Sequence, residues 1–164
     1  MKSPRERKVI PAHTLQVIEL VVDYDLTDEQ AVTLGNYDRW SSPPYRAYYQ
    51  DPHGTRRGKQ KVEAVLVRFD AQLQRYDVGL AFKKWLKLKG AGVRELLALG
   101  AQFPDLQRQF TVVSLSPDKK PVGDPWTSPL LEAREIDGEM RRVFRIPICE
   151  IWWDHPVCFL ALRD

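Results

Sequence analysis

The sequence predicts an α+β fold, with a mixed, mostly antiparallel sheet of about six strands and a helical segment at about 70–110 packed on it. Three observations support this prediction. Short runs of β-branched and aromatic residues recur in both halves of the chain, an amphipathic stretch separates them, and an Asp-Gly pair joins two of the runs. Asp-Gly between two strand patterns is typical of a type I′ hairpin turn.

Length and composition fit one domain. The chain has 164 residues, of which 43% are apolar and 29% are charged, and five Trp, six Tyr and six Phe provide apolar surface for a core. We expect a basic N-terminal tail at 1–12 and a single α+β domain at 13–164.

Nothing in the sequence indicates a membrane or secreted protein. The apolar runs fall short of the ~20 residues that cross a bilayer, and the basic N-terminus lacks the apolar region of a signal peptide. The two cysteines, Cys149 and Cys158, are too few for a disulfide framework, so we expect reduced thiols. These features predict a cytoplasmic protein.

The N-terminal third predicts a strand and then a short helix. Residues 14–24 are rich in Val, Ile and Leu, and we expect a strand that is buried on much of both faces. Thr27 and Gln30 have the spacing of a capping box, so a helix begins here and ends at Gly35-Asn36.

A long loop is expected at 37–61, where Pro, Gly and Ser are mixed with Trp and Tyr. Loops of this length are uncommon and often functional. A second strand is expected at 62–69, where apolar and β-branched residues resume.

The middle of the chain predicts helices. Phe82, Trp85 and Leu86 mark the apolar side of an amphipathic helix that we expect to end near Gly90. A second helix with its own apolar side follows, and Pro104 suits the first turn of a third.

The remainder of the chain predicts strands. They are expected at 111–116, 130–136, 139–148 and 157–162. Asp137-Gly138 connects the second of these to the third. The last strand is apolar on both faces, which indicates a central position in the sheet.

Two segments carry a resemblance to a known group of proteins. They are ELLALGAQFPDLQRQFTVVSLS at 95–116 and CFLALRD at 158–164, and NYDRW at 36–40 adds a short Tyr-Asp motif. In these segments the chain resembles a group of small bacterial proteins with no assigned activity. The resemblance is good over 95–164, poor over 1–60, and departs from the group's glycine-like turn at 114–116. It implies a bacterial domain of the same fold and transfers no catalytic residue.

Cysteine and histidine chemistry is weakly supported. Cys149, Asp154, His155 and Cys158 are types that bind zinc, but their spacing matches neither a paired CxxC nor an HExxH motif. A hairpin between strands at 143–152 and 157–162 would bring the two cysteines close together. A cysteine nucleophile with a histidine base is the other possibility, but both cysteines lie in strand patterns, which favours buried structural thiols.

Asp23 and Asp25 are the candidate metal ligands. Two residues apart at the end of a strand, they point in the same direction, as paired carboxylates that hold Mg²⁺ do. A third carboxylate would have to come from Glu150 or Asp154. Alternatively, the acids only favour the start of the helix that follows.

Basic charge is concentrated at 51–94, which holds 11 basic and four acidic residues. Basic residues interleaved with aromatic ones are typical of surfaces that bind single-stranded nucleic acid. Helical i, i+3, i+4 spacing places three of the lysines on one face, which is also typical of the solvated side of an amphipathic helix. The candidate binding residues are Tyr45, Tyr48, Tyr49, Arg56, Arg57, Lys59, Lys83, Lys84 and Lys87.

The sequence lacks the motifs GxxxxGK[ST], GxGxxG, GxSxG and HExxH of common nucleotide-binding and hydrolytic enzymes. We expect no cofactor. The leading hypothesis is a non-enzymatic protein-binding or regulatory module, which uses loop 37–61 and the basic helix to recognise an acidic partner in a salt-sensitive way. Two alternatives stay open: a module that binds single-stranded nucleic acid, and a metal-dependent hydrolase.

Overall fold

The computed structural model describes residues 12–43, 56–70, 73, 75–115, 128–147 and 157–163, apart from the side chains of Leu15, Arg75 and Tyr76. Its elements in chain order are β1 (Ala12–Asp23), α1 (Asp28–Leu34), β2 (Arg39–Trp40), β3 (Lys59–Phe69), α2 (Arg75–Ala81), a π-helical turn (Phe82–Leu86), β4 (Lys89–Gly90), α3 (Val93–Gln102), α4 (Leu106–Gln109), β5 (Thr111–Ser114), β6 (Leu130–Ile136), β7 (Glu139–Arg145) and β8 (Val157–Arg163).

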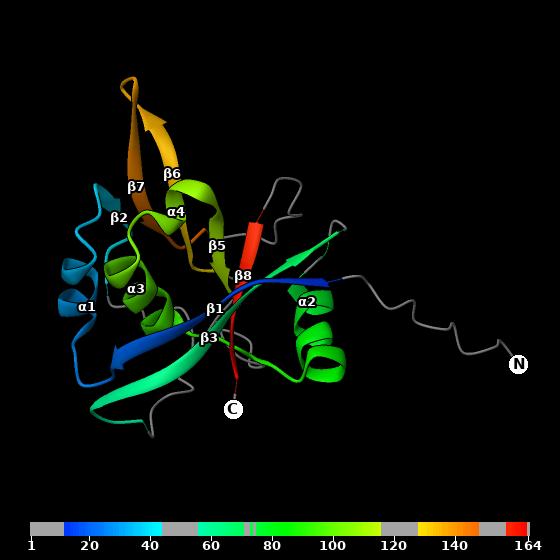
Figure 1. Ribbon diagram of the computed structural model, residues 1–164. Coiled ribbons are helices and arrows are strands. Elements are labelled where there is room, and N and C mark those ends of the chain that lie inside the picture. The colour runs from blue at the N-terminus through cyan, green and yellow to red at the C-terminus, as the bar shows by residue number, and fades with distance from the viewer. Residues whose placement is uncertain are drawn as a thin grey trace, which may run out of the picture.

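The strands form one eight-stranded sheet in the order β1-β3-β8-β5-β6-β7-β2, and β4 also pairs with β8 (Figure 1). Two pairs are parallel, β5 with β8 and β2 with β7, and the others are antiparallel. This confirms the predicted α+β class and the mixed, mostly antiparallel sheet. The strands beyond the expected six are β2 and β4, whose two residues each are too few to show a periodic pattern.

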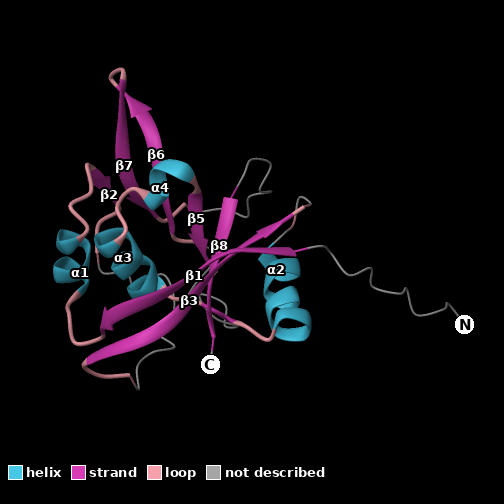
Figure 2. Cartoon of the chain, viewed as in Figure 1, coloured by secondary structure: helices cyan, strands magenta, loops and turns pink. Residues whose placement is uncertain are grey.

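Alternate residues of β3 point to opposite faces of the sheet, as strand geometry requires. Ala64 and Leu66 belong to the core that α1 and α3 cover, while Val65 and Val67 belong to the core under α2. Figure 2 shows these helices on the two sides of the sheet. The predicted packing of helices on the sheet is confirmed, with a separate core on each face.

Several predictions from local sequence motifs are confirmed. Thr27 caps α1 and makes both bonds of the capping box with Gln30. Asp137 and Gly138 both have positive φ, 52° and 79°, which is the geometry of a type I′ turn between β6 and β7. β8 is buried on both faces and lies between β3 and β5, which confirms its central position.

The loop expected at 37–61 is shorter in the structure at both ends. Arg39–Trp40 pair with β7, and β3 begins at Lys59, three residues before the expected start at Val62. The sequence pattern did not predict the start of β3, because the first residues of this strand are polar and lie at its exposed end. Residues 44–55 lie outside the described part of the chain.

The helix expected to end near Gly90 ends earlier. After the π-helical turn, Lys87 takes the left-handed conformation with φ 55°, and Lys89 then pairs with β8. The hydrogen bonds of a π-helical turn join residues five apart rather than four. The i, i+3, i+4 spacing that was expected to place the lysines on one face therefore does not apply there. The third helix, α4, begins at Leu106 rather than at Pro104.

β7 and β8 do not form the hairpin considered for the two cysteines. β8 lies between β3 and β5, whereas β7 lies between β6 and β2. β6 and β7 pair with each other instead and project from the body of the molecule (Figure 1).

A buried arginine connects β7 to the helices. Arg142 is 7% exposed, and its guanidinium donates to the carbonyl oxygens of Gly35 at 2.7 Å and Gly100 at 2.8 Å, and to Gln107 Oε1 at 3.0 Å. It also lies 5.0 Å from the centre of the Tyr37 ring. One side chain therefore joins β7 to the ends of α1 and α3 and to α4.

Within the described residues, the helices are all too short or too polar to cross a membrane.

Candidate functional site

Among the strands that the structure describes, β1 is the last at one end of the sheet. Its register with β3 is continuous over residues 16–23. In an antiparallel pair, successive residues direct their N–H and C=O groups alternately toward the partner strand and away from it. Val21 directs both groups away from β3, because both bond to the side chain of Gln102 on α3. Glu19 and Val17 therefore also direct their backbone groups toward the open edge.

Gln102 occupies part of this edge as a neighbouring strand would. The Val21 N–H donates to Gln102 Oε1 at 3.1 Å, and Gln102 Nε2 donates to the Val21 carbonyl oxygen at 2.7 Å. A side-chain amide carries the same donor and acceptor as a peptide group. The outward backbone groups of Val17 and Glu19 have no hydrogen-bond partner within the part of the chain that the structure describes.

The open stretch of the edge is short. Gln102 closes it at Val21, and an irregularity in the pairing between Thr14 and Gln16 bounds it at the other end. Such irregularities bend a strand and interrupt its ladder. Only the backbone around Val17 and Glu19 remains available between these two limits.

The side chains beside the open edge alternate in character. Val17 is 46% exposed and Val21 is 40% exposed, with Glu19 and Asp23 on the same face of β1. The residues between them are buried on the other face: Ile18, Leu20 and Val22. The expectation that β1 is buried on much of both faces is wrong for this face, because β1 lies at the edge of the sheet and the core under α2 does not cover it.

On the neighbouring strands β3 and β8, this exposed face of the sheet carries charged side chains. Lys61 Nζ lies 3.0 Å from Glu19 Oε1, and Arg163 of β8 pairs with Glu63. Glu19 and Glu63 are directly opposite each other in the register of β1 and β3. Like charges in that position destabilise a sheet, and the two cations offset this repulsion.

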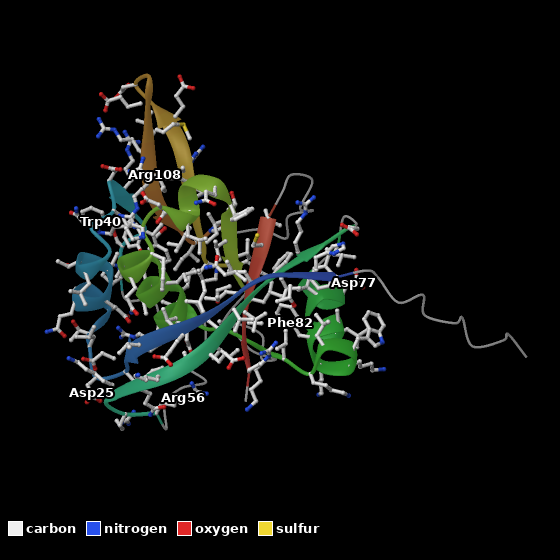
Figure 3. The ribbon with its side chains drawn as sticks, viewed as in Figure 1. Asp25, Trp40, Arg56, Asp77, Phe82 and Arg108 are labelled. Carbon is white, nitrogen blue, oxygen red and sulfur yellow. The ribbon has the colours of Figure 1, made fainter. Side chains whose placement is uncertain are left out.

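A buried polar cluster lies where β1 ends and β3 begins, near Asp25 and Arg56 in Figure 3. Glu95 on α3 is 0% exposed and accepts from the Tyr24 hydroxyl at 3.0 Å and from the Gly92 N–H at 3.2 Å. Arg56 donates to the Tyr24 oxygen at 2.8 Å, and its guanidinium lies 5.5 Å from the centre of the Tyr24 ring. A buried carboxylate requires partners of this kind.

This cluster holds segments together rather than exposing a reactive group. Burial, and next the negative charge of Glu95, raise the pKa of Tyr24 well above its usual value, so the hydroxyl stays protonated even in alkaline solution. Arg94 adds an ion pair with Asp28 at 2.7 Å, which joins the first turns of α3 and α1. The turn after β1, the residues before β3 and the start of α3 are thereby connected.

The candidate basic residues form two groups. Arg56 and Arg57 lie just before β3 and Lys59 is its first residue, and Arg56 is engaged in the buried cluster. The other group lies on and just after the π-helical turn, which follows α2 (Figure 1). This turn is toward the opposite end of β3, because the ring centres of Phe82 and Phe69 are 6.3 Å apart. The three lysines of this group are all exposed: Lys83, Lys84 and Lys87.

The candidate metal ligands lie at the end of β1 and in the turn that follows it. Asp23 Oδ1 accepts from the N–H of Asp25 at 3.1 Å, so this carboxylate closes a local turn. Asp23 also faces Lys59 in the register with β3. The described residues contain no group of three or more His, Cys, Asp or Glu that could hold a metal ion. Glu150 and Asp154 lie outside the described residues.

Cys158 has the properties of a structural thiol. It is buried in β8, and burial raises the pKa of its thiol to about 11. A thiol that is protonated at neutral pH is a poor nucleophile and metal ligand. The other residues singled out by these candidates lie outside the described part of the chain: Tyr45, Tyr48, Tyr49, Cys149 and His155.

Sequence reasoning did not find the open edge or the residue that closes part of it. No motif distinguishes Gln102 from any other polar residue at the end of a helix. A signal for the edge was present in the alternation of valine and acid at residues 17, 19, 21 and 23. The two acids in that alternation indicate an exposed face, whereas the two valines are residues that commonly lie on a buried face.

Comparisons with protein-family models, with curated proteins and with solved structures found no match for this chain. The resemblance of 95–116 and 158–164 to a group of small bacterial proteins stays a prediction.

Proposed function

We propose that this protein is a non-enzymatic protein-binding module and that the open edge of β1 is its binding surface. One observation carries the proposal: the outward backbone groups of Val17 and Glu19 are unpaired in the described part of the chain, beside two exposed valines. An unpaired strand edge is a template for another strand, and strand addition is a recurring mode of peptide recognition.

The buried and partly buried titratable groups support binding over catalysis. Glu95 bonds to Tyr24 and to its own helix N-terminus, and Asp23 closes a turn. Cys158 has a raised pKa and stays a thiol. Each of these groups is engaged in holding the fold.

Crosslinking from the edge tests the proposal. A photo-reactive phenylalanine analogue replaces Val17 in one variant and Leu34, which is exposed on α1, in another. After irradiation in cell lysate at low salt, we expect a discrete adduct from position 17 and none from position 34. Equal labelling from both positions, or no adduct from position 17, would overturn the proposal.

Single-stranded nucleic acid is the second candidate, and the exposure of Lys83, Lys84 and Lys87 supports it. An acidic protein surface is the other ligand that suits these lysines. Phosphate contacts dominate nucleic-acid affinity and weaken steeply with salt. Fluorescence anisotropy with a labelled oligonucleotide tests this candidate. Binding at low salt that is lost when the three lysines become alanine supports it, and no binding at low salt excludes it.

A further inference from the structure

We infer that the open edge of β1 binds an extended segment of another protein in which apolar and basic residues alternate, with a basic residue facing Glu19. This inference rests on the proposed function and adds the chemistry of the partner. It follows from three features of the edge: the backbone groups that no described residue pairs, the amide that already occupies one position, and the charge of the side chains beside it.

The bonds between Gln102 and Val21 show that a peptide-like group fits this edge. Both distances, 3.1 and 2.7 Å, are those of ordinary hydrogen bonds. An incoming strand would place its own peptide groups two and four residues further along, at Glu19 and Val17. Gln102 thus limits the length of the added strand and sets where it ends.

The side chains on the exposed face set the composition of the segment. Residues that face each other across an antiparallel pair have their Cβ atoms about 5 Å apart, so opposite charges attract and like charges repel. Glu19 is largely exposed despite its contact with Lys61. A lysine or arginine of the partner would therefore lie against Glu19, with an apolar residue against Val17.

The probes are two labelled nine-residue peptides that differ only in charge. In both, threonine occupies every odd position and valine positions two and six; positions four and eight are lysine in one peptide and glutamate in the other. Fluorescence anisotropy at low salt measures binding to the intact protein. We expect the lysine peptide to bind more tightly than the glutamate peptide, and Glu19→Lys to reverse that order. Each charge pair is worth roughly a two- to fivefold change in affinity.

A second variant tests the backbone contacts. Glu19→Pro removes an N–H that points away from β3, so it leaves the pairing of β1 with β3 intact while it blocks an added strand. We expect it to weaken binding of the lysine peptide on the order of tenfold, about 1.4 kcal/mol, relative to Glu19→Gln, which also lacks the charge but keeps the N–H. Glu135→Lys, on the exposed part of β6, is the matched charge control and should change neither affinity. Circular dichroism checks that each variant is folded, and if Glu19→Pro is not, the charge reversal at Glu19 decides.

The outcomes separate this inference from the proposed function. An adduct from position 17 together with equal binding of both peptides would overturn the inference that the partner segment alternates apolar and basic residues. The proposed function as a protein-binding module would still hold. The absence of peptide binding to the folded protein would also overturn the inference. Light scattering could instead detect a dimer that Glu19→Pro abolishes. That result would identify a second copy of this chain as the occupant of the edge and would overturn the inference of a segment from another protein.

Discussion

The ring of Tyr37 lies so close to Gly100 of α3 that a Cβ atom at position 100 would overlap the tyrosine hydroxyl. A Cβ atom at Gly35 would meet the same ring. Arg142 lies over that ring, and its guanidinium binds the carbonyl oxygens of both glycines. Two glycines far apart in the sequence therefore form the space that holds one aromatic ring and one buried cation.

Gly100→Ala should destabilise the protein although it replaces glycine in a helix. The added methyl group collides with the hydroxyl of Tyr37, and overpacking of this kind costs about 1–3 kcal/mol. Gly79→Ala in α2 is the matched control, because nothing lies within 4 Å of its Cβ position. There alanine should raise the free energy of unfolding by about 0.5–1 kcal/mol. Urea denaturation measures both, and a stabilising effect at both positions would refute the close packing of Tyr37.

Arg142→Met should lower the free energy of unfolding by about 3 kcal/mol or more, because it leaves several buried oxygen acceptors without their donor. Arg134→Met on β6, where the arginine side chain is mostly exposed, is the control and should change stability by less than about 0.5 kcal/mol. Chemical denaturation of the two variants compares them. Similar small losses would mean that Arg142 does not hold the helix ends to β7.

Arg56→Ala should destabilise the cluster around Glu95, because Tyr24 and the buried carboxylate lose their neighbouring cation. We expect a loss of about 1–3 kcal/mol. Arg57→Ala changes the adjacent, exposed arginine and should be close to neutral. The double variant with Tyr24→Phe should lose less than the sum of the single losses, since both residues belong to one network. Additive losses would show that the two side chains act independently.

Stability should fall as the pH rises from about 9 toward about 11. The unfolded Cys158 thiol loses its proton near its ordinary pKa of 9.0, whereas the buried thiol holds its proton until about 11. In this window the unfolded state binds fewer protons than the native state, so the free energy of unfolding decreases, by up to about 2–3 kcal/mol from this group. Denaturation at several pH values checks this, with Cys158→Ala as the comparison. The prediction fails if the variant shows the same pH slope as the parent protein.

Features that depend on neighbouring residues could be predicted from the sequence. Thr27 and Gln30 are three residues apart, and their reciprocal bonds form wherever that segment becomes a helix. Asp137 and Gly138 accept the positive φ values that a tight hairpin requires. The central position of β8 was visible because all of its apolar residues are consecutive. In each case the physical cause lies within a few residues of its effect.

The candidate site could not be predicted in the same way. Gln102 bonds to Val21 across 81 residues, and Arg142 reaches Gly35 across 107. Whether Val17 is buried or exposed depends on which strand lies beside β1 and where α2 lies, and strand order is set by pairing between distant segments. The sequence by itself thus determined the types of the longer strands and of α1 and α3, the hairpin and the start of α1, because these follow from local bonding and periodicity. Only the tertiary structure decided which strand ends the sheet, and with it the open edge at Val17 and Glu19.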